Sequence, residues 1–517
     1  MKTMRGKERG FTWKSIDEMT LEEKLGQMFV TGFPGDEMDD SFIRLVKEYK
    51  VGNVILFKEN LENREQIKEL CGGIQSLMAD ETGVPAFITI DEEGGIVSRL
   101  PDSLGKMPSA MALSALGSDE NLYEAALLCG KQLAQLGINF NLAPVFDINS
   151  NSANPVIGIR SYGVDVGTVC RYASEAVNGY MNAGILCSGK HFPGHGDTAV
   201  DSHLSLPFSK KSEHELSELE LIPFQRAIDM GIPAITIAHV VYEKLDSVPA
   251  TMSRKIVSGL LREKMGFDGL IISDCMEMIA ISREYGIERG VIEAVAAGIE
   301  LIFISHKHNK VKSSIDALQR EITEGYISME HIDTAVRKIL DLKKKYLGLP
   351  ILKDENAFER CRTFARKVFL ECIHVGKYEE ERFELGDSPC FIAPRQTQVS
   401  QVSNAAREFS FAGELQKEFG GIAVDISLQP THEEVEYAVC TARRATAVVI
   451  GTLNATVYQG QSELLHILEG MEIPMACVTL RNPFELEGLH EDVFTVSAYE
   501  YSARAVDAIK EFFVSER

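Results

Sequence analysis

The 517-residue sequence has no long apolar run and little positive charge relative to its negative charge. No stretch reaches the roughly 20 apolar residues that cross a bilayer, and the basic start MKTMRGKERG is not followed by the apolar segment of a secretory signal. The formal net charge of −23 creates a field that repels phosphate backbones and anionic membrane surfaces. We therefore expect a cytoplasmic protein with no nucleic-acid partner and no membrane insertion. Its oligomeric state stays open.

Cysteine pairs at the spacing of metal or redox sites are also missing. The ten cysteines are scattered, form no CxxC pair and stand mostly inside apolar stretches. This pattern is typical of buried free thiols in a reducing compartment. Hydrophobic residues make up 45% and charged residues 25% of the chain, as in ordinary globular proteins. The length favours two domains, one of which could be a barrel.

Eight short apolar or β-branched runs alternate with longer amphipathic stretches between Gln27 and Ser305. The runs are QMFVTGF, NVILF, AFITID, FNLAPVFD, CSGKHF, AITIAH, GLIISD and LIFIS. The stretches between them, for example NLYEAALLCGKQLAQLG and ELSELELIPFQRAIDMG, place apolar residues at helical spacing and close on Gly. Repeated βα units predict a parallel sheet. Eight of them favour a closed (β/α)₈ TIM-type barrel over an open doubly wound sheet.

A second domain is predicted after the eighth run. Helices are expected near residues 328–346 and 362–376, with the turn-rich GLPILKDENAF between them. The remainder contains the strand-like runs SPCFIAP, TAVVIGT, PMACVTL and FTVSA, which predict a smaller open α/β sandwich domain. We expect a catalytic barrel over residues 1–347, a linker over 348–365 and the second domain over 366–517.

Polar side chains end several of the eight runs. They are Asp91, Asp147, Lys190 with His191, His239 and Asp274. One aspartate at a strand end is more often a helix cap or a turn former than a catalytic group. However, a barrel brings the carboxyl ends of all its strands to one rim, where active sites are built. The set as a whole therefore predicts a catalytic site.

The stretch KHFPGHGDTAVDSH, residues 190–203, concentrates titratable groups. Its proline and glycines exclude a helix, and ordering so many charged side chains on a plain connector has no structural purpose. We expect His195 to shape the loop through hydrogen bonds rather than to react. A zinc site of His191, His195 and His203 is the less favoured alternative, because the first two share a face only on a helix.

Asp201 and His203 flank Ser202 within this loop. In extended backbone that spacing puts both side chains on the same side. An aspartate bonded to one imidazole nitrogen fixes the tautomer and leaves the other nitrogen to exchange a proton near neutral pH. The pair is therefore a candidate acid/base dyad. The alternative is an exposed ion pair that contributes little.

The same loop resembles the signature of the β-N-acetylglucosaminidases of glycoside hydrolase family 3. IDEEGGIVSRL, NLAPVFDIN, VIGIRSYG, PATMS and LREKMGFDGLIISDCMEM are similar to further segments of that family in the same order, and together they span most of the first 300 residues. The resemblance is to the two-domain form, although the C-terminal part is similar only loosely, and no catalytic residue is carried over to it.

The resemblance implies a role for each matched position. Asp274 would be the nucleophile that forms a glycosyl-enzyme intermediate, and His203, oriented by Asp201, the general acid/base. The substrate-binding residues would be Asp91, Arg99, Arg160, Lys190 and His191. The implied reaction is retaining exo-hydrolysis of terminal N-acetylglucosamine from cell-wall (muropeptide-type) or chitin-type oligosaccharides, with peptidoglycan recycling as its setting. The carbohydrate is the only partner implied. No cofactor and no metal are implied.

Three positions depart from the family pattern. Glu92 stands where the family usually has Gln, Ile96 where it has Arg, and Ile159 where it has Glu. We expect the changes at Glu92 and Ile96 to alter the rim or the leaving-group side of the site, and none of the three positions to make the first contacts with the sugar. Other functions stay open: a phosphorylase that passes the sugar to phosphate, a metal-dependent hydrolase, or a sugar-binding protein without catalysis.

Overall fold

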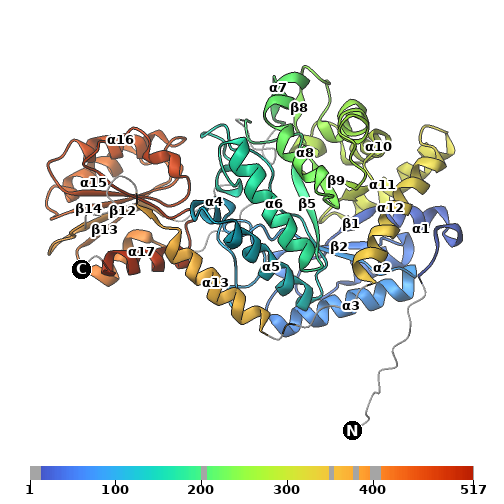
Figure 1. Ribbon diagram of the computed structural model, residues 1–517, viewed down its shortest axis with the longest axis horizontal. Helices are drawn as coiled ribbons and strands as arrows, with labels where there is room; N and C mark the ends of the chain where they lie inside the picture. Colours follow the sequence, from blue (N-terminus) through green and yellow to red (C-terminus); the bar gives the residue numbers. More distant parts are fainter. Residues whose placement is uncertain are drawn as a thin grey trace, which may run out of the picture.

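The computed structural model describes residues 13–198, 206–348, 354, 356–375, 383–395 and 409–515. These residues form two bodies, a large barrel and a smaller sheet domain, with a long helix running along both (Figure 1). In the described part, no helix is of the length and apolarity that a membrane crossing requires.

The larger body is a closed barrel of parallel strands in the order β1-β2-β3-β4-β5-β7-β9-β10. Its strands are β1 (Phe29–Thr31), β2 (Asn53–Leu56), β3 (Phe87–Ile90), β4 (Phe140–Asn141), β5 (Leu186–Phe192), β7 (Ala234–Ile237), β9 (Leu270–Cys275) and β10 (Leu301–Phe303). Every one coincides with a predicted run, so the (β/α)₈ prediction is confirmed. A separate two-stranded sheet joins β6 (Phe208–Ser209) to β8 (Val241–Tyr242).

Helices surround the barrel and bury its outer face. They are α1 (Leu21–Gln27), α2 (Asp40–Tyr49), α3 (Arg64–Thr82), α4 (Ala110–Ala115), α5 (Asp119–Leu136), α6 (Val166–Asn182), α7 (Glu213–Glu218), α8 (Leu221–Asp229), α9 (Ile279–Ser282), α10 (Ile287–Ala297), α11 (His308–Thr323) and α12 (Met329–Leu347). Short 3₁₀ turns are η1 (Ile16–Glu18), η2 (Lys58–Asn60), η3 (Gly158–Arg160) and η4 (Ala250–Met252), and η5 (Lys255–Lys264) is a π-helix.

Local sequence signals fix where these helices begin and end. The hydroxyl of Ser118 accepts the backbone N–H of Asn121 at the start of α5, and Gly137 follows its last turn with φ +89°. One helix prediction was wrong. The stretch 215–231 was expected to be continuous, but the structure separates α7 from α8. Pro223 lies in the first turn of α8, where a proline without an N–H is tolerated, whereas a continuous helix would place it in the interior.

The smaller body is an open sheet in the order β11-β16-β15-β14-β12-β13, parallel except for β11. Its strands are β11 (His374–Val375), β12 (Cys390–Pro394), β13 (Ile422–Ile426), β14 (Val448–Thr452), β15 (Met475–Thr479) and β16 (Phe494–Ser497). Helices α14 (Phe411–Phe419) and α17 (Ala503–Ser515) pack on one face, and α15 (His432–Ala442) and α16 (Gln459–Glu469) on the other. Figure 1 shows α15 and α16 on the opposite side of the sheet from α17. The predicted α/β sandwich is confirmed.

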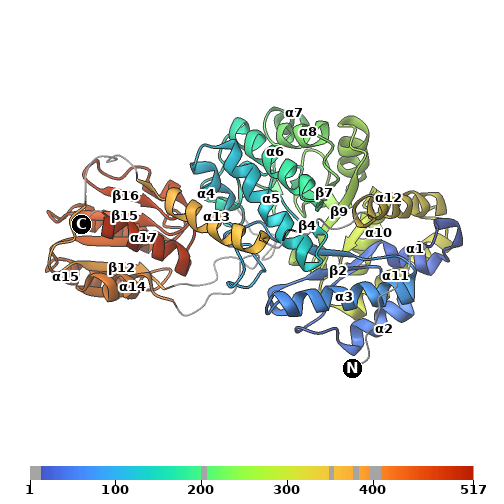
Figure 2. The ribbon, with the colours of Figure 1, turned by 60° about the horizontal axis from the view of Figure 1, so that its bottom comes forward.

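Helix α13 (Ala357–Glu371) connects the two bodies, packing on α5 of the barrel and on α17 of the smaller domain (Figure 2). It begins inside the segment that we assigned to the linker and ends beyond the proposed start of the second domain, while residues 349–353 and 355 of that linker lie outside the described residues. We retain the boundaries 1–347, 348–365 and 366–517 as a proposal.

Loops at the carboxyl ends of the second sheet meet the barrel. After β15, the turn η6 (Pro483–Leu486) follows Asn482, whose side chain donates a hydrogen bond to the backbone of Ser152 at 3.1 Å. Tyr499 and Phe484 pack in one apolar cluster with Ile159, which belongs to η3 of the barrel. The second domain therefore supports the turn that also carries Arg160.

Lys343 is fully buried at the opposite, N-terminal end of the barrel. Its Nζ donates to Gln27 Oε1 at 2.7 Å and to the carbonyl of Gly52 at 3.1 Å, and it lies 5.3 Å from the centre of the Phe87 ring. Burial lowers the pKa of this ammonium well below its ordinary value. The folded protein therefore holds the Lys343 proton less tightly than the unfolded chain does.

We expect Lys343→Met to change how stability depends on pH. Because the unfolded chain binds the extra proton, the stability that Lys343 contributes falls as the pH drops below its unfolded pKa of about 10.4, by up to about 1.4 kcal/mol per pH unit. Denaturant unfolding at pH 7 and 9.5 should show that the free energy of unfolding of the wild type increases relative to that of Lys343→Met as the pH rises. The exposed neighbour Lys344 gives the control, Lys344→Met. Parallel pH curves for wild type and Lys343→Met would contradict the prediction.

Candidate active site

A cavity of about 310 Å³ opens at the carboxyl ends of the barrel strands. The structure brings to its wall every predicted substrate-binding residue and the predicted nucleophile, namely Asp91, Arg99, Arg160, Lys190, His191 and Asp274. These side chains come from the carboxyl ends of four strands, β3, β4, β5 and β9, or from the loops that follow them, as expected for a barrel site. The predicted dyad, Asp201 and His203, lies outside the described residues.

A buried charge network forms one wall of the cavity. The Lys190 ammonium lies 2.7 Å from Asp91 Oδ1 and 2.5 Å from Glu93 Oε1. Arg160 donates two hydrogen bonds to the Glu93 carboxylate, each 2.8 Å long. Burial by itself would raise the pKa of Glu93, but Arg160 and Lys190 outweigh it and hold that pKa far below its usual range. Glu93 is therefore a permanent anion that fixes both cations.

Asp147 organises the adjoining wall. Its Oδ2 accepts the backbone N–H of His191 at 3.1 Å and lies 2.6 Å from His191 Nδ1, while its Oδ1 accepts the backbone N–H of His195 at 2.6 Å. Arg160 Nη2 lies 3.3 Å from His191 Nε2. Because a guanidinium can only donate, this geometry places the imidazole hydrogen of His191 on Nδ1. The imidazole is held in a single orientation.

His195 also lines the cavity. Its Nδ1 is 2.7 Å from Thr198 Oγ1, and burial lowers its pKa to about 4. The expectation that His195 shapes the loop agrees with this bonding. Nearby, Gly196 approaches the backbone so closely that a Cβ there would lie 1.7 Å from the carbonyl oxygen of Ile148. The loop therefore needs glycine at this position.

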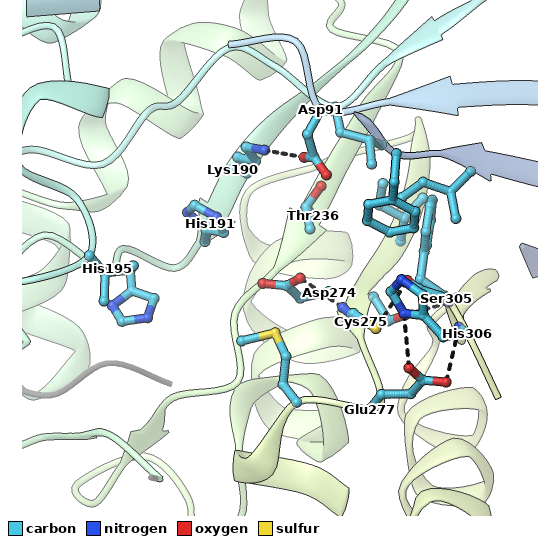
Figure 3. Close-up of a pocket in the computed structure, with 18 of the residues that line it drawn as sticks. Asp91, Lys190, His191, His195, Thr236, Asp274, Cys275, Glu277, Ser305 and His306 are labelled. Atoms are coloured by element: carbon cyan, nitrogen blue, oxygen red, sulfur yellow. Dashed lines mark hydrogen bonds and ion pairs between the residues drawn. The ribbon is translucent and has the colours of Figure 1, made fainter. Parts of the chain in front are cut away.

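Asp274 is the second-last residue of β9, and its Oδ1 accepts the backbone N–H of Cys275 at 2.7 Å. In the close-up, it lies between the Asp91–Lys190 pair and Glu277 (Figure 3).

The peptide bond between Lys190 and His191 is cis. The described part of the chain contains no group of three His, Cys, Asp or Glu side chains arranged to hold a metal ion.

The expectation that Glu92 alters the rim of the site was wrong. Glu92 is buried, not on the rim, and accepts hydrogen bonds from Ser98 Oγ at 2.5 Å and from the backbone of Arg99 at 2.8 Å. Burial raises its pKa. It therefore holds the loop that carries Arg99. Ile96 and Ile159 pack in the cluster shared with the second domain.

Sequence reasoning missed several residues of the site. Glu93 was not singled out, although it follows Asp91 closely at a strand end, and Asp147 was noted as a strand-end residue but given no role. The opposite side of the cavity is lined by Phe57, Glu277 and His306. No pattern in the sequence joins these three, because they follow three different strands, β2, β9 and β10.

The fold and the cavity define a barrel enzyme whose carboxylates and cations line a small polar cavity. The profile described as the glycosyl hydrolase family 3 N-terminal domain matches residues 20–342. The chain belongs to this family, and it is a glycoside hydrolase. This confirms the resemblance on which the sequence-based prediction rested.

Sequence relatives and solved structures agree with this assignment. A β-hexosaminidase A of Pseudoalteromonas piscicida is 33% identical over 58% of this chain, and the chain spans 54% of that protein's length. A β-hexosaminidase of Haemophilus influenzae is 33% identical, covering 55% of this chain and 81% of its own. Among solved structures, the family 3 β-N-acetylglucosaminidase of Paenibacillus sp. str. FPU-7 has a TM-score of 0.86 and 35% identity, covering 96% of this chain and 97% of that one.

Proposed function

We propose that the protein is a retaining exo-β-N-acetylglucosaminidase. It removes terminal N-acetylglucosamine from cell-wall or chitin-type oligosaccharides. The observation that carries the proposal is the placement of Asp274 in one small cavity with the buried Asp91–Lys190–Glu93–Arg160 network. The names of the Paenibacillus structure and of the β-hexosaminidases support the choice of sugar. Cytoplasmic localisation and a role in peptidoglycan recycling remain predictions.

The network supplies what a single sugar unit needs. Asp91 and Lys190 offer acceptors and donors to hydroxyl groups, and Arg160 offers donors from a fixed position, because Glu93 already fixes two of its nitrogens. Fixed donors and acceptors orient the substrate before reaction without further loss of conformational freedom. The anomeric carbon then lies over Asp274. We also assign substrate-binding roles to Arg99 and His191, because their side chains line the same cavity.

The configuration at the anomeric carbon is retained because the reaction consists of two successive displacements at that carbon. The Asp274 carboxylate attacks the anomeric carbon while His203 protonates the departing oxygen, and a covalent glycosyl-enzyme intermediate results. Water, deprotonated by His203, then attacks the same carbon and frees Asp274. Asp201 holds the imidazole in the required tautomer and stabilises its charged form.

A histidine acid/base also bears on which acceptor enters. After giving up its proton, His203 is neutral, whereas a glutamic acid in that role would be an anion. Two like charges about 4 Å apart repel by about 4 kcal/mol at an effective dielectric near 20. An anionic acceptor such as phosphate is therefore tolerated at this site, and phosphorolysis is the second candidate function.

His203→Ala tests the mechanism. We expect it to lose about 10²-fold or more in kcat/KM on N-acetylglucosaminides with poor leaving groups, and far less on activated aryl glycosides, because those depart with little protonation. His214, an exposed histidine on α7, gives the control, His214→Ala, which should match wild type on both. Equal losses on both substrate types would remove His203 from the acid role.

Product analysis with and without phosphate separates the two acceptors. Free N-acetylglucosamine as the sole product under both conditions identifies a hydrolase. A sugar 1-phosphate identifies phosphorolysis. No turnover of any N-acetylglucosaminide by the wild type would contradict the proposed function.

A further inference from the structure

The cavity has a closed side and an open side. The closed side is the charge network, in which the side chains of Arg160, Lys190 and Glu93 are 2%, 5% and 4% exposed. At the open side, the side chain of His306 is 54% exposed while still lining the cavity. The wall that contains His306 is therefore the more accessible side of the cavity.

That wall is an ordered aromatic surface. The rings of Phe57 and His306 lie 4.6 Å apart between centres at an angle of 31°. Phe57 is partly buried and follows β2, while His306 follows β10. Phe57 supports the His306 ring on one side, and the remaining exposure of His306 leaves ring surface facing the mouth.

Glu277 holds the His306 segment in place. One of its oxygens, Oε1, accepts the backbone N–H groups of His306 at 3.1 Å and Lys307 at 2.6 Å, and Oε2 lies 3.3 Å from His306 Nδ1. A carboxylate with these partners has little capacity left for a ligand. Burial would raise the pKa of Glu277, but the bonds from His306 and Lys307 outweigh it and lower that pKa. Glu277 is therefore a positioning residue.

We propose that Phe57, His306 and Glu277, the rim platform, form the binding site for the leaving-group unit, and that the unit bound there is a second pyranose ring. The proposal rests on the proposed function. The C–H face of a pyranose carries partial positive charge, which the negative face of an aromatic ring attracts. His306 contacts the second sugar, Phe57 supports His306, and Glu277 fixes the angle of the ring. The platform thereby selects oligosaccharides over glycosides with small leaving groups.

The test compares two substrates that share the terminal sugar. N-acetylglucosaminyl fluoride has a leaving group without a ring, whereas the β-linked disaccharide of N-acetylglucosamine places a pyranose on the platform. We expect His306→Ala to lower the ratio of kcat/KM for the disaccharide to that for the fluoride by about tenfold, which equals about 1.4 kcal/mol. Most of the loss should appear as a higher KM for the disaccharide.

Further variants separate the ring from the positioning. His306→Phe should restore most of the ratio, because it keeps an aromatic face. Glu277→Ala should lower the ratio in the same direction as His306→Ala, and Glu277→Gln, which keeps an acceptor oxygen, should lower it less. Tyr326, an exposed aromatic residue outside the cavity lining, provides the control, Tyr326→Ala, whose ratio should equal that of wild type.

Two failures are distinguishable. A wild-type enzyme that turns over neither substrate contradicts the proposed function, and the platform fails with it. An active wild type whose ratio is unchanged in His306→Ala, or whose two substrates lose equally, overturns the platform and leaves the proposed function standing.

Discussion

Asp274→Asn is expected to fold as the wild type does and to lose activity by a factor on the order of 10⁴ or more. Asparagine has nearly the same shape as aspartate, and its side-chain oxygen can still accept the backbone N–H of Cys275 that Asp274 accepts at 2.7 Å. However, a neutral amide cannot supply the anionic nucleophile that the glycosyl-enzyme intermediate requires. The loss should therefore lie in kcat, with little change in the circular dichroism spectrum.

Labelling identifies the nucleophile directly. A slow fluorinated glycoside should trap the intermediate, and mass spectrometry of peptides should find the sugar on Asp274. Asp268 precedes the same strand and is fully exposed, so Asp268→Asn is the matched control and should keep wild-type activity. A label on another carboxylate, or substantial activity in Asp274→Asn, would remove Asp274 from the nucleophile role.

Glu93→Gln is expected to cost about 3–5 kcal/mol of stability, because it leaves the buried Arg160 guanidinium without its carboxylate partner, whereas Lys190 keeps Asp91. Both Arg160 and Lys190 lose their common anion, and each is nearly inaccessible to solvent. The substrate-binding wall should lose its order as well, which raises KM. Denaturant midpoints measured together with KM test both effects.

An exposed ion pair gives the control for Glu93→Gln. Arg171 and Asp119 are about half exposed, so Asp119→Asn should cost less than about 1 kcal/mol.

The stability that Glu93 contributes depends on pH with a definite sign. Because the pKa of Glu93 is depressed in the folded protein, its stabilisation is fully present above an unfolded value of about 4.3 and is lost as the pH falls. A stability loss in Glu93→Gln no larger than that of Asp119→Asn would contradict this account.

The extent to which the fold could be predicted differed between strands. All eight barrel strands were predicted, because strands buried in a barrel form continuous apolar runs that turn residues interrupt. β13 was missed. It is one of the two edge strands of the second sheet, and Ile422 at its start is exposed while Val424 and Ile426 are buried. Its residues, IAVDI, alternate large apolar with small or polar side chains, which is the pattern of a half-buried strand, so the sequence contained a signal that could have predicted it.

The site was predictable where chemistry and a strand end coincide. Asp91, Lys190, His191 and Asp274 were selected on that ground, and the structure places them around one cavity. The roles of Glu93 and Glu277 depend on partners far away in the sequence, such as Arg160 and His306. Such pairings have no periodic signature, so they emerge only when the chain has folded.

By itself, the sequence determined the barrel, the two-domain architecture, the family and the strand ends that carry the reactive side chains, since local hydrophobic period and short motifs encode each of these. Only the tertiary structure decided the internal order of the site. It showed that Glu93 joins Arg160 to Lys190, that Asp147 holds His191, and that His306 rests on Phe57 at the mouth. These contacts depend on distances between residues that follow different strands. Closure of the barrel determines those distances, and no local sequence pattern indicates them.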